Sequence, residues 1–483
     1  MASIHGKVIE VLPPLVVDLD GTLLRSDLLL ETAMAFVRSR PLQVFNLLAW
    51  WLKGKAALKE GLALATELDV TVLPYDPVVL ERIQAARASG RMVVLATASH
   101  HSLAERIADH LGVFDEVYAS DAKRNLSAHR KRDLLVASYG EGGFDYMGNS
   151  QDDLSIWQAS RQAIVVNPDT GVESRAKAYG NVEEVIRSNP SGVKVWLKAL
   201  RVHQWMKNAL IFVPLLAAHQ LNRPEQIVNG VLAFLFFGLC ASSVYLLNDL
   251  LDLADDRHHK TKCKRPFASG RLSIHSGLVV VPLLLLAAFG GAALLLPWQF
   301  SAVLASYYVL TLGYSLYLKR QMTFDVIVLA MLYTARIIAG VAAFSVPLTF
   351  WILAFSMFMF LSLALVKRYA ELRDARSRDV LGQTRGRGYF PGDLDMIASL
   401  GAASGYLAVM VLALYIHDTT TAAQYTLPHL IWLACPMLLF WITRVWMLTH
   451  RGLMNDDPVV FAIRDRISQV IGALLCLVFW IAA

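Results

Sequence analysis

The chain has 483 residues, of which 55% are hydrophobic and only 17% are charged, and the apolar excess is concentrated after about residue 205. This profile excludes a uniformly soluble protein and predicts a soluble part followed by a membrane part. The formal net charge is +6, but no arginine-rich arm interleaved with aromatic residues is present. We therefore expect phosphate groups and the lipid bilayer as partners, and no nucleic acid.

The N-terminal part alternates short apolar runs with helical patterns. Residues 14–17 and 92–96 are apolar runs that end in polar residues, and residues 77–89 and 102–111 have helical patterns. Strands that alternate with helices predict a parallel sheet, whose functional groups lie at the carboxyl ends of its strands. No basic region followed by an apolar run begins the chain, so we expect no cleaved signal peptide and a cytoplasmic first domain.

Four motifs within about residues 10–180 resemble, in order, those of haloacid-dehalogenase superfamily phosphatases. They are DxDGT at 18–22, the strand-end Thr97, Lys131 in HRKRDLL, and GNSQDD at 148–153. The resemblance implies a Rossmann-like α/β domain that uses Mg²⁺.

The residue types fit phosphatase chemistry. Asp18 is suited to attack phosphorus and Asp20 to protonate the leaving oxygen and later activate water, while Thr97 and Lys131 would hold the phosphoryl group. The metal would be held at this site by Asp18, Asp20, Asn149 and Asp153. The family usually has an acid where this chain has Asn149, which leaves a degenerate regulatory or scaffolding domain as the alternative.

The domain boundaries follow from composition. Residues 1–182 are expected to form the phosphatase-like domain, interrupted by a helical cap at about 26–80. The aromatic-rich segment 41–55 of this cap is suited to the membrane interface, although packing on its own domain explains it equally well. Residues 183–200 are expected to be a linker, and residues 201–483 a polytopic membrane bundle.

Nine apolar runs of roughly spanning length follow the linker. They lie near 207–219, 227–247, 277–297, 298–318, 323–344, 347–366, 397–416, 428–448 and 467–483. If the N-terminus is inside, the inner loops hold nineteen Lys and Arg residues and the outer connections only Arg223. We expect an integral protein of a bacterial inner or plasma membrane, and this bias predicts a cytoplasmic N-terminal domain and an external C-terminus.

The segment 248–266 carries the clearest chemistry of the membrane part. Asn248, Asp252 and Asp256 are four residues apart and share one helix face, with Asp249 close by. The bases that follow are Arg257, Lys260, Lys264 and Arg265. Acids at this spacing, backed by cations, predict a site for a Mg²⁺-diphosphate. A solvated juxtamembrane loop is the alternative, but the ordered spacing favours the site.

Several motifs from about residue 193 onward resemble the UbiA superfamily of intramembrane prenyltransferases. They are VHQWMKN at 202–208, NDxxDxxxDR at 248–257, KRP at 264–266, and residues 314–320. The resemblance implies an all-α bundle that holds a metal-diphosphate at one mouth. In place of the usual second aspartate-rich motif, this chain has the base-rich KRYAELRDARSRD at 367–379. The added positive charge suits a substrate with a further phosphate.

This departure, together with RGxxxDDPVVFA at 451–462, resembles the decaprenyl-phosphate phosphoribosyltransferase branch. The branch transfers 5-phosphoribose from phosphoribosyl diphosphate to a polyprenyl phosphate. The alternative is prenyl transfer from a prenyl diphosphate to a small acceptor. Both reactions expel diphosphate from an electron-deficient carbon, so the first acid motif alone does not choose between them.

The resemblance implies a role for each candidate residue of the membrane part. Asp252 and Asp256 would be catalytic through the metal. The residues expected to hold Mg²⁺ are Asn248, Asp249, Asp252, Asp256, Glu371 and Asp374. The residues expected to bind substrate phosphate are Lys207, Arg257, Lys260, Lys264, Arg265, Lys319, Lys367, Arg368 and Arg378.

Two other classes of membrane protein fit the sequence less well. A transporter would place its binding groups near the bilayer midplane, whereas these clusters gather at one face, and a scaffold would not need ordered acid motifs.

The fusion of the two parts suggests that the phosphatase-like domain removes the 5-phosphate from the lipid product in an envelope-lipid pathway.

Overall fold

The computed structural model describes residues 12–121, 125–189, 192–218, 220, 222–377, 388–418, 425–454 and 457–482. The chain divides into two compact units. The first comprises residues up to Leu200 together with Tyr245–Val280, and the second comprises Arg201–Val244 and Val281–Ala483. The aspartate-rich segment therefore belongs to the same unit as the N-terminal domain.

The first unit is built on a parallel sheet, as the sequence predicted, and this sheet has six strands in the order β3-β2-β1-β4-β5-β6. The strands are β1 (Leu15–Val17), β2 (Val93–His100), β3 (Glu116–Ser120), β4 (Asp145–Gly148), β5 (Gln162–Val166) and β6 (Val182–Ile186). The strand order reverses between β1 and β4, and parallel sheets place their sites at such a switch point. Strand β6 pairs with β5, so the sheet extends into the range expected to be linker.

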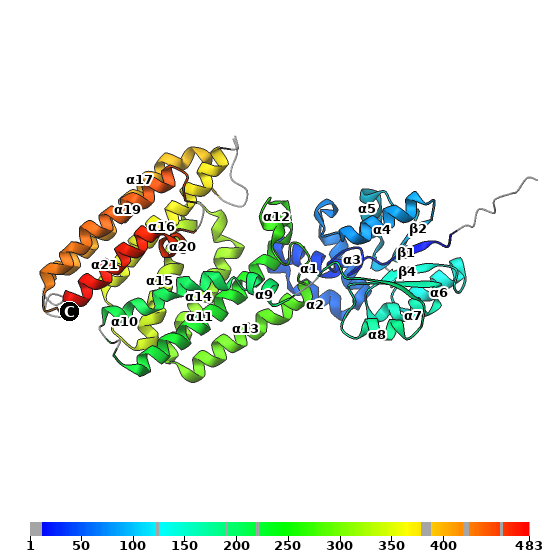
Figure 1. Cartoon of the computed structure of the whole chain (residues 1–483), viewed down its shortest axis with the longest axis horizontal. Coiled ribbons are helices and arrows are strands. Elements are labelled where there is room, and N and C mark those ends of the chain that lie inside the picture. The colour runs from blue at the N-terminus through cyan, green and yellow to red at the C-terminus, as the bar shows by residue number, and fades with distance from the viewer. Residues whose placement is uncertain are drawn as a thin grey trace, which may run out of the picture. The chain divides into compact units, whose positions relative to one another are not determined.

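Helices cover both faces of this sheet (Figure 1). Their bounds are α4 (Pro77–Ala88), α5 (His101–Leu111), α6 (His129–Tyr139), α7 (Leu154–Ala159) and α8 (Val172–Lys177). Strand β1 shows why two layers form. Leu15 and Val17 belong to one buried apolar cluster and Val16 belongs to another, because successive side chains of a strand point to opposite faces.

The insertion between β1 and α4 is helical, as expected of a cap. It consists of α1 (Leu28–Ser39), η1 (Pro41–Gln43), α2 (Phe45–Leu52), α3 (Lys55–Ala65) and η2 (Val70–Val72). Asp27 caps α1 because its side chain accepts from the backbone N–H of Leu30 at 3.0 Å. On α2, Phe45 and Trp51 are exposed, so both explanations of the aromatic segment stand.

The later part of the chain is helical. Its helices include α9 (Val193–Ala199), η4 (Val202–Phe212), α10 (Val213–Ala217), α11 (Pro224–Leu251), α12 (Leu253–His258), η5 (Lys262–Lys264), α13 (Ile274–Leu295), α14 (Trp298–Leu316) and η6 (Leu318–Arg320). They continue with α15 (Phe324–Phe344), α16 (Phe350–Arg376), η7 (Pro391–Asp393), α17 (Leu394–His417), η8 (Pro428–Leu433), α19 (Ala434–His450), α20 (Pro458–Arg464) and α21 (Arg466–Ala482).

The expected count of nine spans is not confirmed. Over the described ranges, six helices are long and apolar enough to cross a membrane, or seven if α20 and α21, which meet at a bend of 81°, form one span. The run 207–219 lies in η4 and α10, which have 11 and five consecutive residues and together are shorter than the roughly 20 residues that a crossing needs. Helix α14 has 19 residues but carries several polar side chains, and it is not among the six.

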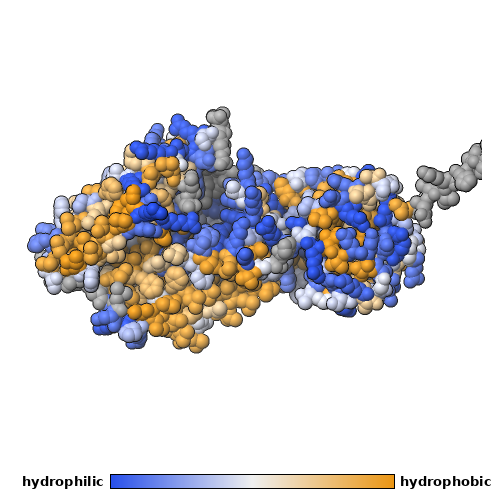
Figure 2. Space-filling view, viewed as in Figure 1, coloured by the Kyte–Doolittle hydropathy of each residue, from blue (hydrophilic) through white to orange (hydrophobic). Residues whose placement is uncertain are grey.

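The membrane helices expose apolar side chains, as a lipid-facing bundle requires. Leu283 is 57% exposed, Leu286 72% and Leu294 85%, all on α13. Figure 2 shows apolar residues gathered over this part of the chain, whereas the visible face of the sheet domain is mixed. The chain is therefore a multi-pass membrane protein with a folded α/β domain.

Replacement of Trp157 on α7 tests how the core packing of the α/β domain contributes to its stability. Its side chain is fully buried, and its Nε1 donates to the carbonyl of Tyr146 at 3.3 Å. We expect Trp157→Ala to destabilise this domain by about 3–5 kcal/mol through the cavity that it leaves. The measurement is the denaturant midpoint at which amides of β4 and β5 lose protection from hydrogen exchange in the full chain. The exposed Trp51→Ala is the control, with an expected change within about 0.5 kcal/mol; equal midpoints for both variants would contradict the packing.

Candidate functional site

The first cluster centres on Asp18, directly after β1. Lys131 from α6 donates through Nζ to Asp18 Oδ1 at 2.7 Å, and both side chains are buried. The same Nζ donates to the Tyr146 hydroxyl at 2.8 Å and lies 3.7 Å from Asp153 Oδ1. The parallel strands thus bring predicted residues from three motifs together at one edge of the sheet.

Asp153 orders the loop after β4. Its Oδ1 accepts from the Tyr146 hydroxyl at 2.7 Å, and its Oδ2 accepts from the backbone N–H groups of Asn149 and Ser150 at 3.0 and 2.9 Å. Sequence reasoning did not identify Tyr146, although it lies two residues before the glycine of the fourth motif. Its hydroxyl links Lys131 to Asp153.

Asp20 is held from two directions. Its Oδ2 accepts from the Ser99 hydroxyl at 2.6 Å, and its Oδ1 accepts from the backbone N–H of Leu28, at the start of α1, at 2.8 Å. Fully buried Thr97 accepts through Oγ1 from the backbone N–H of Ser99 at 3.0 Å. Thr97 therefore connects through Ser99 to Asp20, a link that the sequence did not indicate.

Burial sets the acidity of the two aspartates. It raises the pKa of Asp18 to about 7, an effect that the Lys131 ammonium partly offsets. It also raises the pKa of Asp20 to about 6, with a further increase from Asp27 and an offset from the Ser99 hydroxyl. A carboxyl group with a raised pKa is better able to donate a proton near neutral pH, as a general acid must.

Gly21 allows Asn149 to approach the nucleophile loop. Gly21 has φ +76°, and a Cβ at this position would overlap the amide of Asn149. The Asn149 Oδ1 accepts from the Thr22 hydroxyl at 3.4 Å. Asn149 therefore lies against Gly21 and Thr22, in the loop that follows Asp18 and Asp20.

The cap contributes a cation that sequence reasoning missed. Lys59 on α3 is half-buried and donates through Nζ to the carbonyl of Ala98 at 2.5 Å and to Asn125 Oδ1 at 3.0 Å. Ala98 directly follows Thr97, so this cation reaches the strand end that carries the cluster. Nothing in the spacing of the cap sequence distinguishes Lys59 from its other lysines.

The second cluster is the aspartate-rich segment. Helix α11 ends at Leu251 and α12 begins at Leu253, but the backbone bonds from Asp252 N to Asn248 O and from Asp256 N to Asp252 O continue the helical pattern at 2.9 and 2.8 Å. Arg265 Nη1 lies 3.1 Å from Asp249 Oδ1 and 2.7 Å from Asp256 Oδ2. Two buried carboxylates therefore converge on one cation.

The other residues of this segment divide into two groups. Asp252 lies 2.9 Å from Arg38 and Arg257 lies 2.6 Å from Glu31, so both pair with helix α1. Lys260 and Lys264 are exposed. Burial raises the pKa of Asp256 to about 6, although the Arg265 guanidinium acts in the opposite direction.

The third cluster lies in the second unit, around Asp457 at the start of α20. Lys207 Nζ lies 2.8 Å and Lys367 Nζ 3.8 Å from Asp457 Oδ2, and the Tyr333 hydroxyl donates to the same carboxylate at 3.0 Å. Two predicted cations thus meet at one acid. Asp457 belongs to the motif at 451–462, but the sequence did not indicate a role for it.

A neighbouring ion-pair network holds α15 and α16 together. Arg368 is buried and contacts Asp325 and Glu371, while the Tyr314 hydroxyl donates to Asp325 Oδ1 at 2.8 Å. Arg368 therefore forms ion pairs with two carboxylates, those of Asp325 and Glu371. Lys319 lies in η6, and Arg378 lies outside the described residues.

A cavity of about 530 Å³ adjoins Lys367 and Asp457 in the second unit. Both acids and bases line it. Its charged lining residues are Lys367, Glu371, Arg373, Asp374 and Asp457. A polar cavity of this size can hold a phosphorylated group of the size of a phosphosugar.

Within the described part of the chain, no group of three or more His, Cys, Asp or Glu side chains is arranged to hold a metal ion. The donor types nevertheless fit Mg²⁺, which takes oxygen ligands and usually only one or two carboxylates besides water and substrate phosphate. Asp249 and Asp256 converge on Arg265 Nη1, as they would on a cation. At the first cluster, Asp18 and the Asn149 amide oxygen are suitable donors.

Two family models match the chain. That of the UbiA prenyltransferase family matches residues 209–463, and that of haloacid dehalogenase-like hydrolases matches residues 15–137. The first range covers most of the membrane part, and the second covers β1, β2, β3 and the cap but ends before β4.

Three relatives match different shares of the chain. The chain is 39% identical to the uncharacterized protein y4nM of Sinorhizobium fredii over 97% of this chain and 91% of the relative. It is 38% identical to nodulation protein NoeC of Azorhizobium caulinodans, over 59% of this chain and 92% of the relative. It is 30% identical to decaprenyl-phosphate phosphoribosyltransferase of Mycobacterium tuberculosis, over 60% and 94%. The chain belongs to the UbiA prenyltransferase family and carries a haloacid dehalogenase-like domain before its membrane part.

Proposed function

We propose that this protein transfers 5-phosphoribose from phosphoribosyl diphosphate to a polyprenyl phosphate, and that its first domain then removes the 5-phosphate. The observation that carries the transfer is the third cluster, where Lys207 and Lys367 meet beside a polar cavity. These cations are additional to Arg265 of the aspartate-rich segment. A substrate with phosphate beyond the departing diphosphate would use them. The name of the mycobacterial relative supports the same reaction.

The transfer forms a bond between an oxygen of the lipid phosphate and C1 of the ribose as the bond from C1 to diphosphate breaks. Mg²⁺, when bound, would neutralise the departing diphosphate. Asp249, Asp252 and Asp256 would hold it, and Arg265 would bind phosphate oxygens. Lys207 and Lys367 would bind the remaining phosphate, with Asp457 holding both ammonium groups in place.

The first domain would perform hydrolysis through a covalent intermediate. Asp18 attacks phosphorus, and the ester oxygen leaves with the proton of Asp20; Asp20 then takes a proton from the water that hydrolyses the aspartyl-phosphate. Lys131 donates a hydrogen bond to Asp18 and would neutralise the negative charge of the phosphoryl oxygens. Removal of the 5-phosphate would draw the preceding transfer forward, and the covalent linkage of the two domains raises the local concentration of the lipid product.

Replacement of Asp256 by Asn tests the metal site. We expect a loss of about 10²-fold or more in the transfer rate, because a group that stabilises transition-state charge is removed. The assay supplies full-length protein in membranes with Mg²⁺, labelled phosphoribosyl diphosphate and polyprenyl phosphate. Asp255→Asn is the matched control, because its side chain is 60% exposed, and it should retain most of the rate. A chelator should abolish transfer. Labelled lipid formed only from a prenyl diphosphate would instead identify a prenyl transfer.

Replacement of Asp18 by Asn tests the hydrolytic step. In the same assay the variant should accumulate phosphorylated lipid-linked ribose, while the wild type yields the dephosphorylated form, because the amide cannot attack phosphorus. Products are separated by chromatography with and without added phosphatase. Asp133→Asn, at an exposed position on α6, should match the wild type. Identical product profiles for all three proteins would exclude the coupling.

The orientation of the chain is a further part of the proposal. The Lys and Arg bias places the α/β domain inside and the C-terminus outside. With α14, whose 19 residues span about 28 Å, the six helices and the bent pair α20–α21 give eight crossings, so an external C-terminus also requires the consecutive η4 and α10 to cross as a ninth. A reporter fused after Ala483 should be accessible from outside the cell, whereas a reporter before residue 12 should not. An inaccessible C-terminal reporter would show that the number of crossings is even.

A further inference from the structure

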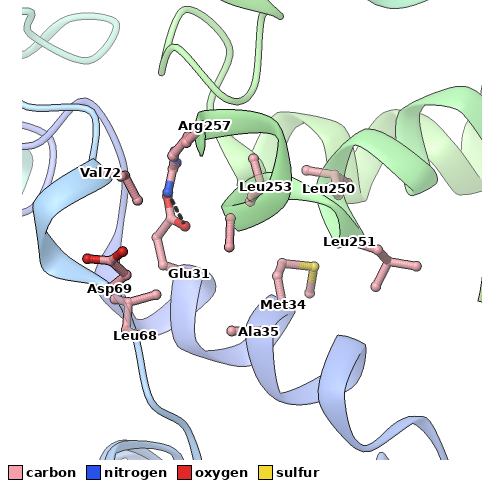
Figure 3. A pocket seen from close by; sticks show the side chains of 11 residues that line it. Glu31, Met34, Ala35, Leu68, Asp69, Val72, Leu250, Leu251, Leu253 and Arg257 are labelled. Atoms are coloured by element: carbon pink, nitrogen blue, oxygen red, sulfur yellow. Dashed lines mark hydrogen bonds and ion pairs between the residues drawn. The ribbon is translucent and has the colours of Figure 1, made fainter. Parts of the chain in front are cut away.

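Helix α1 of the cap packs against α12 of the aspartate-rich segment within the first unit (Figure 3). The Glu31 carboxylate accepts from Arg257 Nη2 at 2.6 Å and from Nη1 at 3.0 Å, and both side chains are almost fully buried. The Ser26 hydroxyl donates to Glu31 at 2.5 Å, and Arg257 Nε donates to the carbonyl of Ala268 at 3.0 Å. This bidentate pair therefore has a fixed geometry.

A second ion pair lies two turns further along α1. Arg38 Nη2 is 2.9 Å from Asp252 Oδ1 and 3.5 Å from Asp255 Oδ2. Residues 31 and 38 are seven apart and share one face of α1. Their partners, residues 257 and 252, run in the opposite direction along the second segment. Met34 and Ala35 lie between the two pairs and face Leu250 and Leu251 across a small apolar pocket (Figure 3).

The position of Asp252 makes the second pair unusual. Asp252 is the N-cap residue of α12, where an aspartate commonly accepts from backbone N–H groups of the first turn. Its side chain makes no such capping bond, and its carboxylate meets Arg38 instead. The Asp252 side chain is only 12% exposed. Arg38 is therefore a close counter-ion of this carboxylate.

We infer that Arg38 is a built-in competitor for the metal: it neutralises Asp252 in the unloaded protein and is displaced when a divalent cation with diphosphate binds. The inference rests on the proposed role of Asp252 as a metal ligand. A guanidinium and a divalent cation both require the electron pairs of the same carboxylate. The Glu31–Arg257 pair, which is more deeply buried, keeps α1 in place while Arg38 exchanges. Arg38 is thus a positioning residue supplied by the phosphatase-like domain.

Helix α1 also connects Arg38 to the first cluster. The N-terminus of α1 donates from Leu28 N to Asp20 Oδ1, and its last turn carries Arg38. One helix of 12 residues therefore contacts both the proton donor of one reaction and the metal segment of the other. Release of Arg38 would change the restraints on the helix that orients Asp20.

The test measures binding of Mn²⁺ with inorganic diphosphate to the purified full-length protein by electron paramagnetic resonance. If Arg38 competes, Arg38→Gln should lower the dissociation constant about three- to five-fold, since a partly exposed ion pair no longer has to be broken. Arg40→Gln removes the same charge from the exposed C-cap of α1 and should leave the dissociation constant unchanged. Equal constants for the two variants, or weaker binding by Arg38→Gln, would overturn the inference.

Two further variants separate this inference from the proposed metal site. Asp252→Asn should weaken Mn²⁺ binding; if it does not, the metal role of Asp252 is wrong, whatever Arg38 does. In Asp252→Asn, the added change Arg38→Gln should no longer tighten binding, because the pair is already broken. Hydrogen exchange at the amides of α1 should increase with Mn²⁺-diphosphate in the wild type and not in Arg38→Gln.

Discussion

Pairing of buried carboxylates with cations is the interaction on which all three clusters of this protein depend. Asp18 is held by Lys131, Asp249 and Asp256 by Arg265, and Asp457 by Lys207. Removal of a charge from water is costly, and in each cluster a cation within hydrogen-bond reach offsets part of that cost. The same pairing prepares these acids for exchange, since a metal ion or a phosphate group can replace or share the partner.

Local patterns predicted the parts of the fold that depend on few residues. The apolar run of β1 and the acids after it placed Asp18 at a strand end, and parallel topology then brought Lys131 and Asp153 to it. The partners Tyr146 and Ser99 were missed because their roles arise only when separate strands meet. The span expected at 207–219 is not confirmed for a related reason: hydropathy alone does not reveal that Val202–Phe212 form a 3₁₀ helix.

The contact between Arg38 and Asp252 was beyond prediction from one sequence. Nothing in the cap marks Arg38 as different from Arg40, and the spacing of Asn248, Asp252 and Asp256 is explained by a metal site alone. Only the packing of α1 on α12 brings this arginine to the motif. A relative that covers nearly the whole chain shares the fusion of the two parts, which is consistent with a cap that does more than cover its own site.

The chemistry of leaving diphosphate explains why the aspartate-rich segment does not identify the substrate. Prenyl and ribosyl transfer both build positive charge on carbon while diphosphate departs, so the same acids and Mg²⁺ serve either. The two reactions differ in what else must be neutralised. An isoprenoid chain presents no charge beyond its diphosphate, whereas phosphoribose and a lipid phosphate bring two further anionic groups. Asp457 holds Lys207 and Lys367 beside a polar cavity. These two cations would have no partner in an isoprenoid chain, but they can pair with the further phosphate groups of the ribosyl reaction.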